Sequence, residues 1–331
     1  MQTASKRSGR ASLLRKLKEL DAFIGGTPLK RLDNPIGSLY AKLEYNNFSG
    51  SVKDRAAFSM IYHAIKDGKI DDRTTIVASS SGNLAIAAAL ICKFIGLRFI
   101  PVIDPNINDD YEALLSLVCF RVEKVDQRDQ TGGFLLTRLA KVSAICTGLP
   151  NSFVLDQYGD PNNYRGYYKL GIEVLSSLNP EYVFVAISSG GVVTGLSKSL
   201  KSKRPNIKVI GVDVEGSVIF GQTPQKRYIS GIGSSLVPSI LKDALIDEVI
   251  HISQIDIATG CRQLLTEQLI FAGASSGAVY LAATRYMDKN TFSGKPTALL
   301  LFADKGYPYL DTIYNEGWVK KLACLSDCQE K

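Results

Sequence analysis

The sequence contains no run of the roughly eighteen consecutive apolar residues that a membrane-spanning helix requires. Its N-terminus is basic but has no apolar stretch of the kind found in secretory signals. The chain has 331 residues, of which 45% are hydrophobic and 21% charged. This balance is typical of a globular domain large enough to bury its own core, and we expect no association with membranes.

Histidine is scarce, and the cysteines do not form a recognisable metal-binding pattern. The two histidines, His63 and His251, lie far apart in sequence, and none of the six cysteines belongs to a Cys-x-x-Cys pair. We therefore expect neither a metal site nor a disulfide framework. Unpaired cysteines in a chain without a signal sequence are typical of a reducing compartment, which predicts a cytoplasmic protein.

Two common nucleotide-binding fingerprints are also absent. The chain has neither a Walker loop ending in Gly-Lys-Ser/Thr nor a Gly-x-Gly-x-x-Gly dinucleotide motif. The net charge is +7, and the densest basic stretches, residues 6–18 and 198–208, lack the interleaved aromatic residues of a base-stacking surface. A mildly basic surface is the better interpretation, so no nucleic-acid partner is predicted.

Strands and helices alternate along the chain. Some predicted strands, such as 183–187, are continuous apolar runs, which indicate parallel sheets buried on both faces. We predict an α/β fold of two lobes, each with a mainly parallel sheet flanked by helices. The expected strands are 39–43, 75–78, 98–103, 120–125, 182–187, 208–214 and 297–302. The expected helices are 12–23, 53–67, 84–95, 109–117, 133–147, 163–178, 192–203, 255–268 and 276–287.

Two motifs in the first half suggest chemistry. Lys53 follows a Gly-Ser pair at a predicted helix start, where unpaired amides favour the neutral amine that covalent catalysis needs, although alone it is more often a solvated lysine. Residues 79–83 (SSSGN) join a strand to an apolar helix. Free amides there can bind a carboxylate, and helix capping is an equally good explanation.

Two more motifs lie in the second half. Residues 188–195 (SSGGVVTG) follow an apolar strand and open a helix, an arrangement that binds phosphate, although tight helix packing is the alternative. Residues 273–278 (GASSGA) precede a helix rich in small residues, where a serine can also serve as the helix cap.

The order of these four motifs resembles that of fold-type II pyridoxal 5′-phosphate (PLP) enzymes, in the cysteine synthase and cystathionine β-synthase family. The likeness runs from about residue 24 to residue 318. It implies that Lys53 holds PLP as a Schiff base and removes the α-proton, and that Asn83 bonds the cofactor's 3′-oxygen. Residues implied to bind the cofactor phosphate are Ser188, Ser189, Gly190, Gly191, Val192 and Thr194. Residues implied to bind the substrate carboxylate are Ser80, Ser81 and Gln157.

The resemblance also implies that Ser275 faces the pyridine nitrogen, with Asp304 as a competitor for that place. The segments 132–138, 216–221, 231–235 and 271–273 are more similar to a smaller group, the N-(2-amino-2-carboxyethyl)-L-glutamate synthases. That group implies β-replacement, in which O-phospho-L-serine and L-glutamate are joined. Both substrates are anionic, so Arg165 is a candidate ligand, whereas Arg138 is interpreted as a solvated helix residue.

Val192 and Leu84 depart from the cysteine synthase pattern, since both replace hydroxyl residues. Two other functions stay open: a cysteine synthase that uses sulfide, and a catalytically silent PLP-fold sensor or scaffold. The family also implies a homodimer. We expect a smaller mobile lobe over 35–148, which contains the loop over 79–83 that is implied to bind the substrate carboxylate (the carboxylate loop). The larger phosphate-binding lobe is expected over 12–34 and 149–320, and tails at 1–11 and 321–331.

Overall fold

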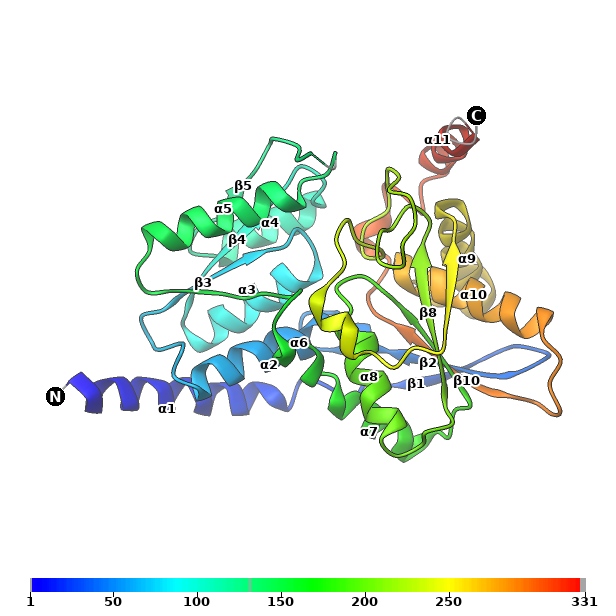
Figure 1. Ribbon diagram of the computed structural model, residues 1–331, viewed down its shortest axis with the longest axis horizontal. Helices are drawn as coiled ribbons and strands as arrows, with labels where there is room; N and C mark the ends of the chain where they lie inside the picture. Colours follow the sequence, from blue (N-terminus) through cyan, green and yellow to red (C-terminus); the bar gives the residue numbers. More distant parts are fainter. Residues whose placement is uncertain (1, 131, 328–331) are drawn as a thin grey trace. The chain divides into compact units, whose positions relative to one another are not determined.

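The computed structural model describes residues 2–130 and 132–327. It divides into two compact units (Figure 1). Unit 1 comprises Met1–Gly25 and Asn47–Gly166, and unit 2 comprises Gly26–Asn46 and Tyr167–Lys331. Compared with the expected lobes, residues 35–46 fall in the second unit, while 12–25 and 149–166 fall in the first.

Unit 1 contains a four-stranded sheet whose paired strands are all parallel, in the order β5-β4-β3-β6. Helices α3 and α5 pack against its strands. The strands are β3 (Thr75–Ser79), β4 (Arg98–Ile103), β5 (Glu123–Lys124) and β6 (Ser152–Val154). The helices are α1 (Gln2–Asp21), α2 (Lys53–Lys66), α3 (Asn83–Ile95), α4 (Asp109–Val118), α5 (Leu135–Gly148) and α6 (Pro161–Arg165).

Unit 2 contains a six-stranded sheet in the order β1-β2-β10-β7-β8-β9, in which β1 is antiparallel to β2 and the other pairs are parallel. The strands are β1 (Leu29–Leu32), β2 (Ser38–Leu43), β7 (Tyr182–Ala186), β8 (Lys208–Val214), β9 (Glu248–Ile252) and β10 (Thr297–Phe302). The helices are α7 (Tyr168–Ser177), α8 (Gly191–Lys201), α9 (Gln254–Gln268), α10 (Ala274–Lys289) and α11 (Glu316–Asp327). Three 3-10 turns are also present: η1 (Glu44–Asn46), η2 (Ser239–Asp243) and η3 (Tyr307–Tyr309).

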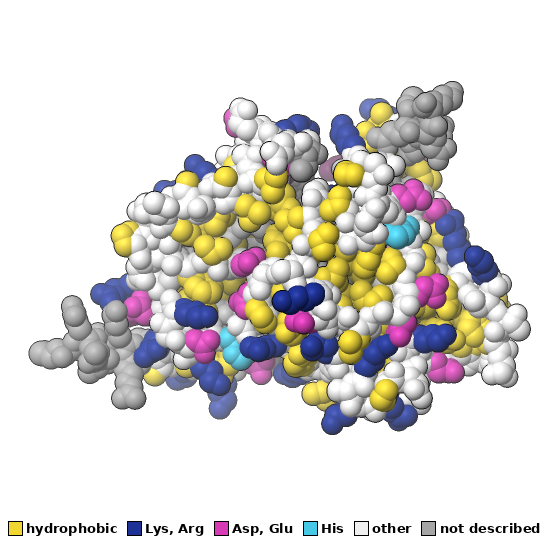
Figure 2. Space-filling view, in the orientation of Figure 1, with side chains coloured by type: hydrophobic (Ala, Val, Ile, Leu, Met, Phe, Trp, Pro, Cys, Tyr) yellow, Lys and Arg dark blue, Asp and Glu magenta, His cyan; other side chains and the backbone are white. Residues whose placement is uncertain are grey.

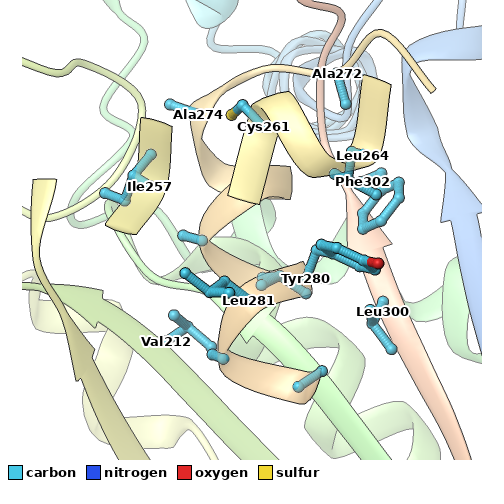
Figure 3. Close-up of a cluster of buried hydrophobic side chains, with 14 of the residues drawn as sticks. Val212, Ile257, Cys261, Leu264, Ala272, Ala274, Tyr280, Leu281, Leu300 and Phe302 are labelled. Carbon is cyan, nitrogen blue, oxygen red and sulfur yellow. The ribbon is translucent and has the colours of Figure 1, made fainter. Parts of the chain in front are cut away.

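The large core of unit 2 forms between its sheet and helices α9 and α10 (Figure 3). Val212 of β8 and Leu300 of β10 contribute from the sheet, while Cys261 and Leu281 contribute from the helices; each is at most 6% exposed. Burial of a single large apolar side chain of this kind stabilises a fold by about 1.5–3 kcal/mol. This packing fixes the start of α10, where one of the four motifs lies.

The expected α/β architecture with mainly parallel sheets is confirmed, and three expected elements need correction. The helix expected over 163–178 is two helices, α6 and α7, separated near Gly166, where a Cβ would collide with the carbonyl oxygen of Arg55. The strand expected over 120–125 is limited to Glu123–Lys124. Helix α1 begins at Gln2, so most of the expected N-terminal tail is helical.

The expected C-terminal tail over 321–331 begins inside α11, and residues 328–331 lie outside the described part of the chain. Within the described residues, we find no helix that is both long and apolar enough to cross a membrane. On the face shown in Figure 2, Lys and Arg side chains are interspersed with Asp and Glu.

Leu269 follows helix α9 with φ 54° and ψ 38°, a left-handed conformation that side chains with a Cβ disfavour. Its side chain is 85% exposed, so little packing offsets this backbone cost. Leu269→Gly is expected to raise the free energy of unfolding by about 0.5–1 kcal/mol, measured by urea denaturation. Leu265→Gly, within α9, serves as the control and should lower it by about 1 kcal/mol. A loss of stability in Leu269→Gly would contradict the strain argument.

Candidate active site

Three polar loops of unit 1 lie at the same edge of its sheet. Ser80 and Ser81 follow β3, Asp104 follows β4, and Gln157 comes three residues after β6. Strands β4 and β6 both pair in parallel with β3, so their carboxyl ends meet at one edge. In open parallel sheets this edge is where ligands bind. The fold therefore brings the expected carboxylate-binding residues Ser80, Ser81 and Gln157 to one place.

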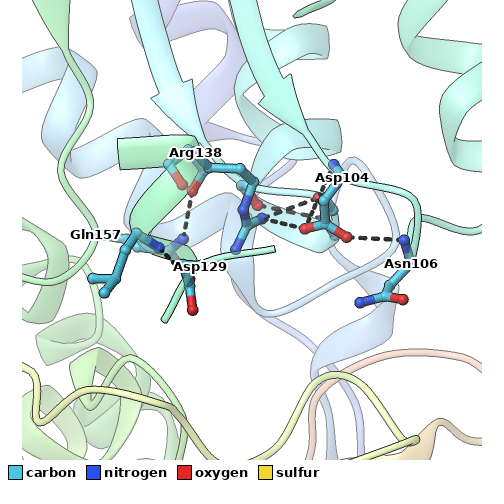
Figure 4. Close-up of polar contacts among 10 residues, drawn as sticks. Asp104, Asn106, Asp129, Arg138 and Gln157 are labelled. Carbon is cyan, nitrogen blue, oxygen red and sulfur yellow. Dashed lines mark hydrogen bonds and ion pairs between the residues drawn. The ribbon is translucent and has the colours of Figure 1, made fainter. Parts of the chain in front are cut away.

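Ser81 belongs to a hydrogen-bonded cluster with two charged residues (Figure 4). Its hydroxyl donates to Oδ2 of Asp104 at 2.8 Å and accepts from Nη1 of Arg138 at 3.0 Å. The guanidinium lies 3.2 Å from the same Asp104 oxygen. The side chains of Arg138 and Asp104 are 13% and 7% exposed, so the ion pair is largely shielded from water.

Arg138 is therefore not the solvated helix residue that the sequence predicted. It lies in the first turn of α5, the start of which is held by Asp129: the Asp129 carboxylate accepts from the amide of Leu136 at 2.8 Å. Nε of Arg138 is buried and has no hydrogen-bond partner among the described residues. A guanidinium with an unused buried donor, beside the loop that the sequence predicts to bind a carboxylate, is suited to an anionic ligand.

Gln157 is held in a fixed orientation. Its Nε2 donates to the carbonyl of Ser79 at 3.1 Å, and its backbone carbonyl accepts from Nδ2 of Asn163 at 2.6 Å. The neighbouring Tyr158 lies within the field of Arg138 and Asp104, and burial raises the pKa of its phenol. Its hydroxyl is accordingly neutral at physiological pH and remains a hydrogen-bond donor.

Lys53 is the first residue of α2, at the end of a tightly fixed turn. The Ser51 hydroxyl accepts from the amide of Lys53 at 3.3 Å, and the carboxylate of Asp54 accepts from the amide of Ser49 at 2.8 Å. Gly50 has φ +89°, a conformation that glycine adopts readily. These contacts fix the backbone from which the Lys53 amine projects.

Asn83 is the first residue of α3, the helix that follows the carboxylate loop. Its Oδ1 accepts a hydrogen bond from the hydroxyl of Tyr111 at 2.7 Å. Arg165, the other basic candidate from the sequence, lies exposed at the end of α6 and donates to Asn162 at 3.0 Å. The structure therefore places Arg138, and not Arg165, against Ser81.

In unit 2, the expected phosphate-binding residues lie in the turn from β7 into α8 and in the first turn of α8. Gly190 has φ +79° and directly precedes α8, so the first amides of this eleven-residue helix, which have no intrahelical partner, open onto the loop. The Ser188 hydroxyl donates to the carbonyl of Gly233 at 3.1 Å, and that of Thr194 to the carbonyl of Ile240 at 3.3 Å. Backbone amides are thus the main donors available for a phosphate.

At the start of α10, Ser275 lies two residues after Gly273, which the Asp304 carboxylate contacts. Ser275 and Ser276 are 5% and 0% exposed, and the Ser276 hydroxyl has no partner among the described residues. The Asp304 carboxylate lies against Gly273 and accepts from the hydroxyl of Tyr309 at 3.0 Å. Within unit 2, an amide-rich loop and a buried serine pair suit the phosphate and the ring of a phosphorylated pyridine aldehyde, and within unit 1 the turn before α2 carries a lysine. The residues of each unit, taken by itself, therefore fit PLP.

Asp104 and Tyr111 were not predicted from the sequence, and Arg138 was considered but interpreted as a solvated helix residue. Asp104 carried a usable signal, because it directly follows a strand that was predicted correctly next to the serine loop. Arg138 lies in the segment 132–138, one of those that resemble the smaller synthase group, but its place on a helix did not show that its guanidinium would be shielded. Tyr111 carried no signal, since it looks like an ordinary helix residue until the helices pack.

Comparisons with known proteins agree with this geometry. Residues 20–304 match the family described as "Pyridoxal-phosphate dependent enzyme". Two proteins named N-(2-amino-2-carboxyethyl)-L-glutamate synthase are similar to the chain. The one from Ralstonia nicotianae is 39% identical, covering 92% of each chain. The one from Cupriavidus metallidurans is 41% identical, covering 91% of this chain and 90% of that protein.

The fold is also similar to those of solved enzyme structures. An O-acetylserine dependent cystathionine beta-synthase from Helicobacter pylori has a TM-score of 0.82 at 30% identity, covering 89% of this chain and 98% of that chain. A cysteine synthase from Entamoeba histolytica has a TM-score of 0.82 at 28% identity, covering 89% and 90%. The family match spans well over half of the sequence, and both relatives align over nearly all of it. The chain therefore belongs to the family of pyridoxal-phosphate dependent enzymes.

Proposed function

We propose that the protein is a β-replacement synthase that joins O-phospho-L-serine and L-glutamate, giving N-(2-amino-2-carboxyethyl)-L-glutamate and phosphate. The observation that carries this proposal is the similarity, at 39–41% identity over more than 90% of the chain, to two proteins named for that product. The buried Arg138 beside Ser81 supports it, since both proposed substrates are anionic.

PLP, when bound, supplies the electron sink that lets the α-proton and then the β-substituent leave the donor amino acid. Lys53 would hold the cofactor through its amine, and the same amine would take the α-proton of the donor amino acid. The Asn83 amide donates to the cofactor's 3′-oxygen. The phosphate is bound by the loop that precedes α8 and by its first turn, with residues Ser188, Ser189, Gly190, Gly191, Val192 and Thr194.

The substrate carboxylate is held by the loop that precedes α3. Ser80, the first amides of α3 and Gln157 provide its donors in this proposal. Ser81 already donates its hydroxyl proton to Asp104, so it serves chiefly through its backbone and by orienting Arg138. Arg138 offers positive charge to a second anionic group, either the donor phosphate or the side-chain carboxylate of glutamate.

Ser275 is proposed to face the pyridine nitrogen. The Asp304 carboxylate accepts from the hydroxyl of Tyr309, and its backbone carbonyl accepts from the amide of Gly273, so Asp304 helps to hold the start of α10, where Ser275 lies. A hydroxyl in this place would accept or donate one hydrogen bond and, unlike a carboxylate, would add no negative charge beside the ring nitrogen.

A cysteine synthase is the second candidate. Its support is the fold match to solved structures titled as cysteine synthase and O-acetylserine dependent cystathionine beta-synthase. Their identities of 28–30% are lower than the 39–41% shared with the glutamate-named synthases, which is why sulfide ranks second. A silent sensor or scaffold would not need Lys53, and this residue argues against that alternative.

The proposal is tested by supplying the two nucleophiles separately. Protein loaded with PLP is mixed with O-phospho-L-serine, and phosphate release is followed with L-glutamate or with sulfide. We expect glutamate to sustain many turnovers and to yield a product with the mass of N-(2-amino-2-carboxyethyl)-L-glutamate. Turnover with sulfide and not with glutamate would replace the proposal by cysteine synthase, and no turnover with either would remove both.

We further propose a cytoplasmic homodimer. The thiols of Cys92, Cys119, Cys146, Cys261 and Cys324 are all free, as in proteins of reducing compartments. The homodimer follows from the family resemblance alone. Movement of the unit that carries the carboxylate loop on donor binding remains a prediction.

A further inference from the structure

Tyr111 contacts a residue of the proposed site without belonging to any of the four motifs. It lies in the first turn of α4, where the side chain of Asn108 accepts from the amides of Asp110 at 3.1 Å and Tyr111 at 3.3 Å. From this capped turn, the Tyr111 hydroxyl reaches Oδ1 of Asn83 at 2.7 Å. Both residues belong to unit 1, and α3 packs against α4.

The direction of this hydrogen bond decides which end of the Asn83 amide is available to a ligand. A carboxamide has an acceptor end and a donor end, and a phenol has one proton to donate. When the Tyr111 proton is given to Oδ1, the two N–H groups of Nδ2 point to the other side. In the flipped amide, Nδ2 would donate to the phenol oxygen instead, the Tyr111 proton would lose its acceptor on Asn83, and the carbonyl oxygen would be presented on the other side.

The 3′-oxygen of PLP accepts hydrogen bonds in its anionic form. An N–H donor stabilises that form, whereas a carbonyl oxygen in the same place would repel it. Donation to Oδ1 also polarises the amide and strengthens the N–H groups as donors. The orientation of Asn83 therefore matters to the charge of the cofactor ring as well as to cofactor affinity.

We infer that Tyr111 is a positioning residue, which fixes the Asn83 amide so that its N–H groups, and not its carbonyl, meet the 3′-oxygen of the cofactor. This inference rests on the proposed role of Asn83 and extends it to a second residue on another helix. It predicts that the hydroxyl of Tyr111 influences the cofactor only while Asn83 is present.

The test is a double-mutant cycle with Tyr111→Phe, Asn83→Ala and the variant that carries both changes. Two properties of the PLP-loaded protein are measured at one fixed pH: the ratio of its long-wavelength to short-wavelength absorption bands, and the dissociation constant of PLP. Tyr62→Phe is the matched control, because Tyr62 lies in the same unit with its ring stacked on Phe58. Thermal unfolding of the cofactor-free proteins monitors the fold.

We expect Asn83→Ala to lower the band ratio and to weaken PLP binding about tenfold or more, as for loss of a hydrogen bond to a charged group. Tyr111→Phe should move both readings in the same direction, with binding weakened about threefold to tenfold. In the double variant, the added Tyr111→Phe change should have no further effect on either reading. The control and all cofactor-free melting curves should match the parent protein.

Two results would overturn the inference. In the first, Asn83→Ala has a lowered band ratio but Tyr111→Phe has the ratio of the parent protein. This result would leave the role of Asn83 intact. The other is an equal effect of Tyr111→Phe with and without Asn83. A normal band ratio in Asn83→Ala would instead remove the proposed role of Asn83, and the inference about Tyr111 with it.

Discussion

Lys53→Ala is expected to lose the visible absorption of the lysine-bound cofactor and to reduce turnover by at least about 10³-fold. General-base catalysis alone contributes about 10²–10⁴-fold, and the same side chain also provides the covalent attachment. The turn over residues 49–54 is held by hydrogen bonds to the backbone amides of Ser49 and Lys53, and Lys53 is the first residue of α2. The backbone position of this lysine is therefore fixed, and no other lysine shares its place at the helix start.

The measurement is an absorption spectrum of protein incubated with excess PLP, together with phosphate release from O-phospho-L-serine. Lys66→Ala, at the exposed end of the same helix, is the control and should retain both properties. Borohydride reduction followed by peptide mass analysis should place the cofactor on Lys53 in the parent protein. A lysine-linked spectrum that survives in Lys53→Ala, or a label on another lysine, would show that the attachment site was assigned wrongly.

Much of the fold could be predicted because its strands and helices are locally distinctive. Strands β4, β8 and β10 have the bounds expected from their apolar runs, and α2 was predicted to within one residue. The missed strands β1, β6 and β9 are three to five residues long, and at most one residue of each is buried, so period and hydrophobicity gave little signal.

The residues of the candidate site also differ in whether the local sequence reveals them. Loops such as 79–83 and 188–195 could be found from the sequence because glycine and serine follow apolar strands there. The cluster around Ser81 could not, because it depends on α5 packing beside the sheet. A single arginine on a predicted helix gives no indication that its guanidinium will be 13% exposed and paired with an aspartate.

Arg138→Met is expected to have the largest effect on stability. The change leaves the Asp104 carboxylate, 7% exposed, without its cation, and the loss of one partner from a buried ion pair typically costs about 3–5 kcal/mol. Asp104 retains hydrogen bonds from the Ser81 hydroxyl and the Asn106 amide. We therefore expect a loss of about 3 kcal/mol, at the lower end of that range, in urea denaturation of the cofactor-free protein.

Two further variants separate the ion pair from the rest of the side chain. Arg285→Met removes an exposed arginine that pairs with Asp256, and it should cost less than about 1 kcal/mol. Asp104→Asn combined with Arg138→Met should recover about half of the lost stability, because the unpaired charge is removed as well. A loss in Arg138→Met no greater than that in Arg285→Met would show that the Ser81 cluster is not held by its charges.

The same variants distinguish structural support from substrate binding. If Arg138 only supports the loop, the double variant, having regained stability, should also regain its affinity for O-phospho-L-serine and L-glutamate. If the guanidinium contacts one of these substrates, the KM for that substrate should stay about tenfold or more above the parent value in both Arg138 variants. We expect the second result, because the buried Nε of Arg138 has no partner among the described residues and Arg138 contacts Ser81, in the loop proposed to bind the substrate carboxylate.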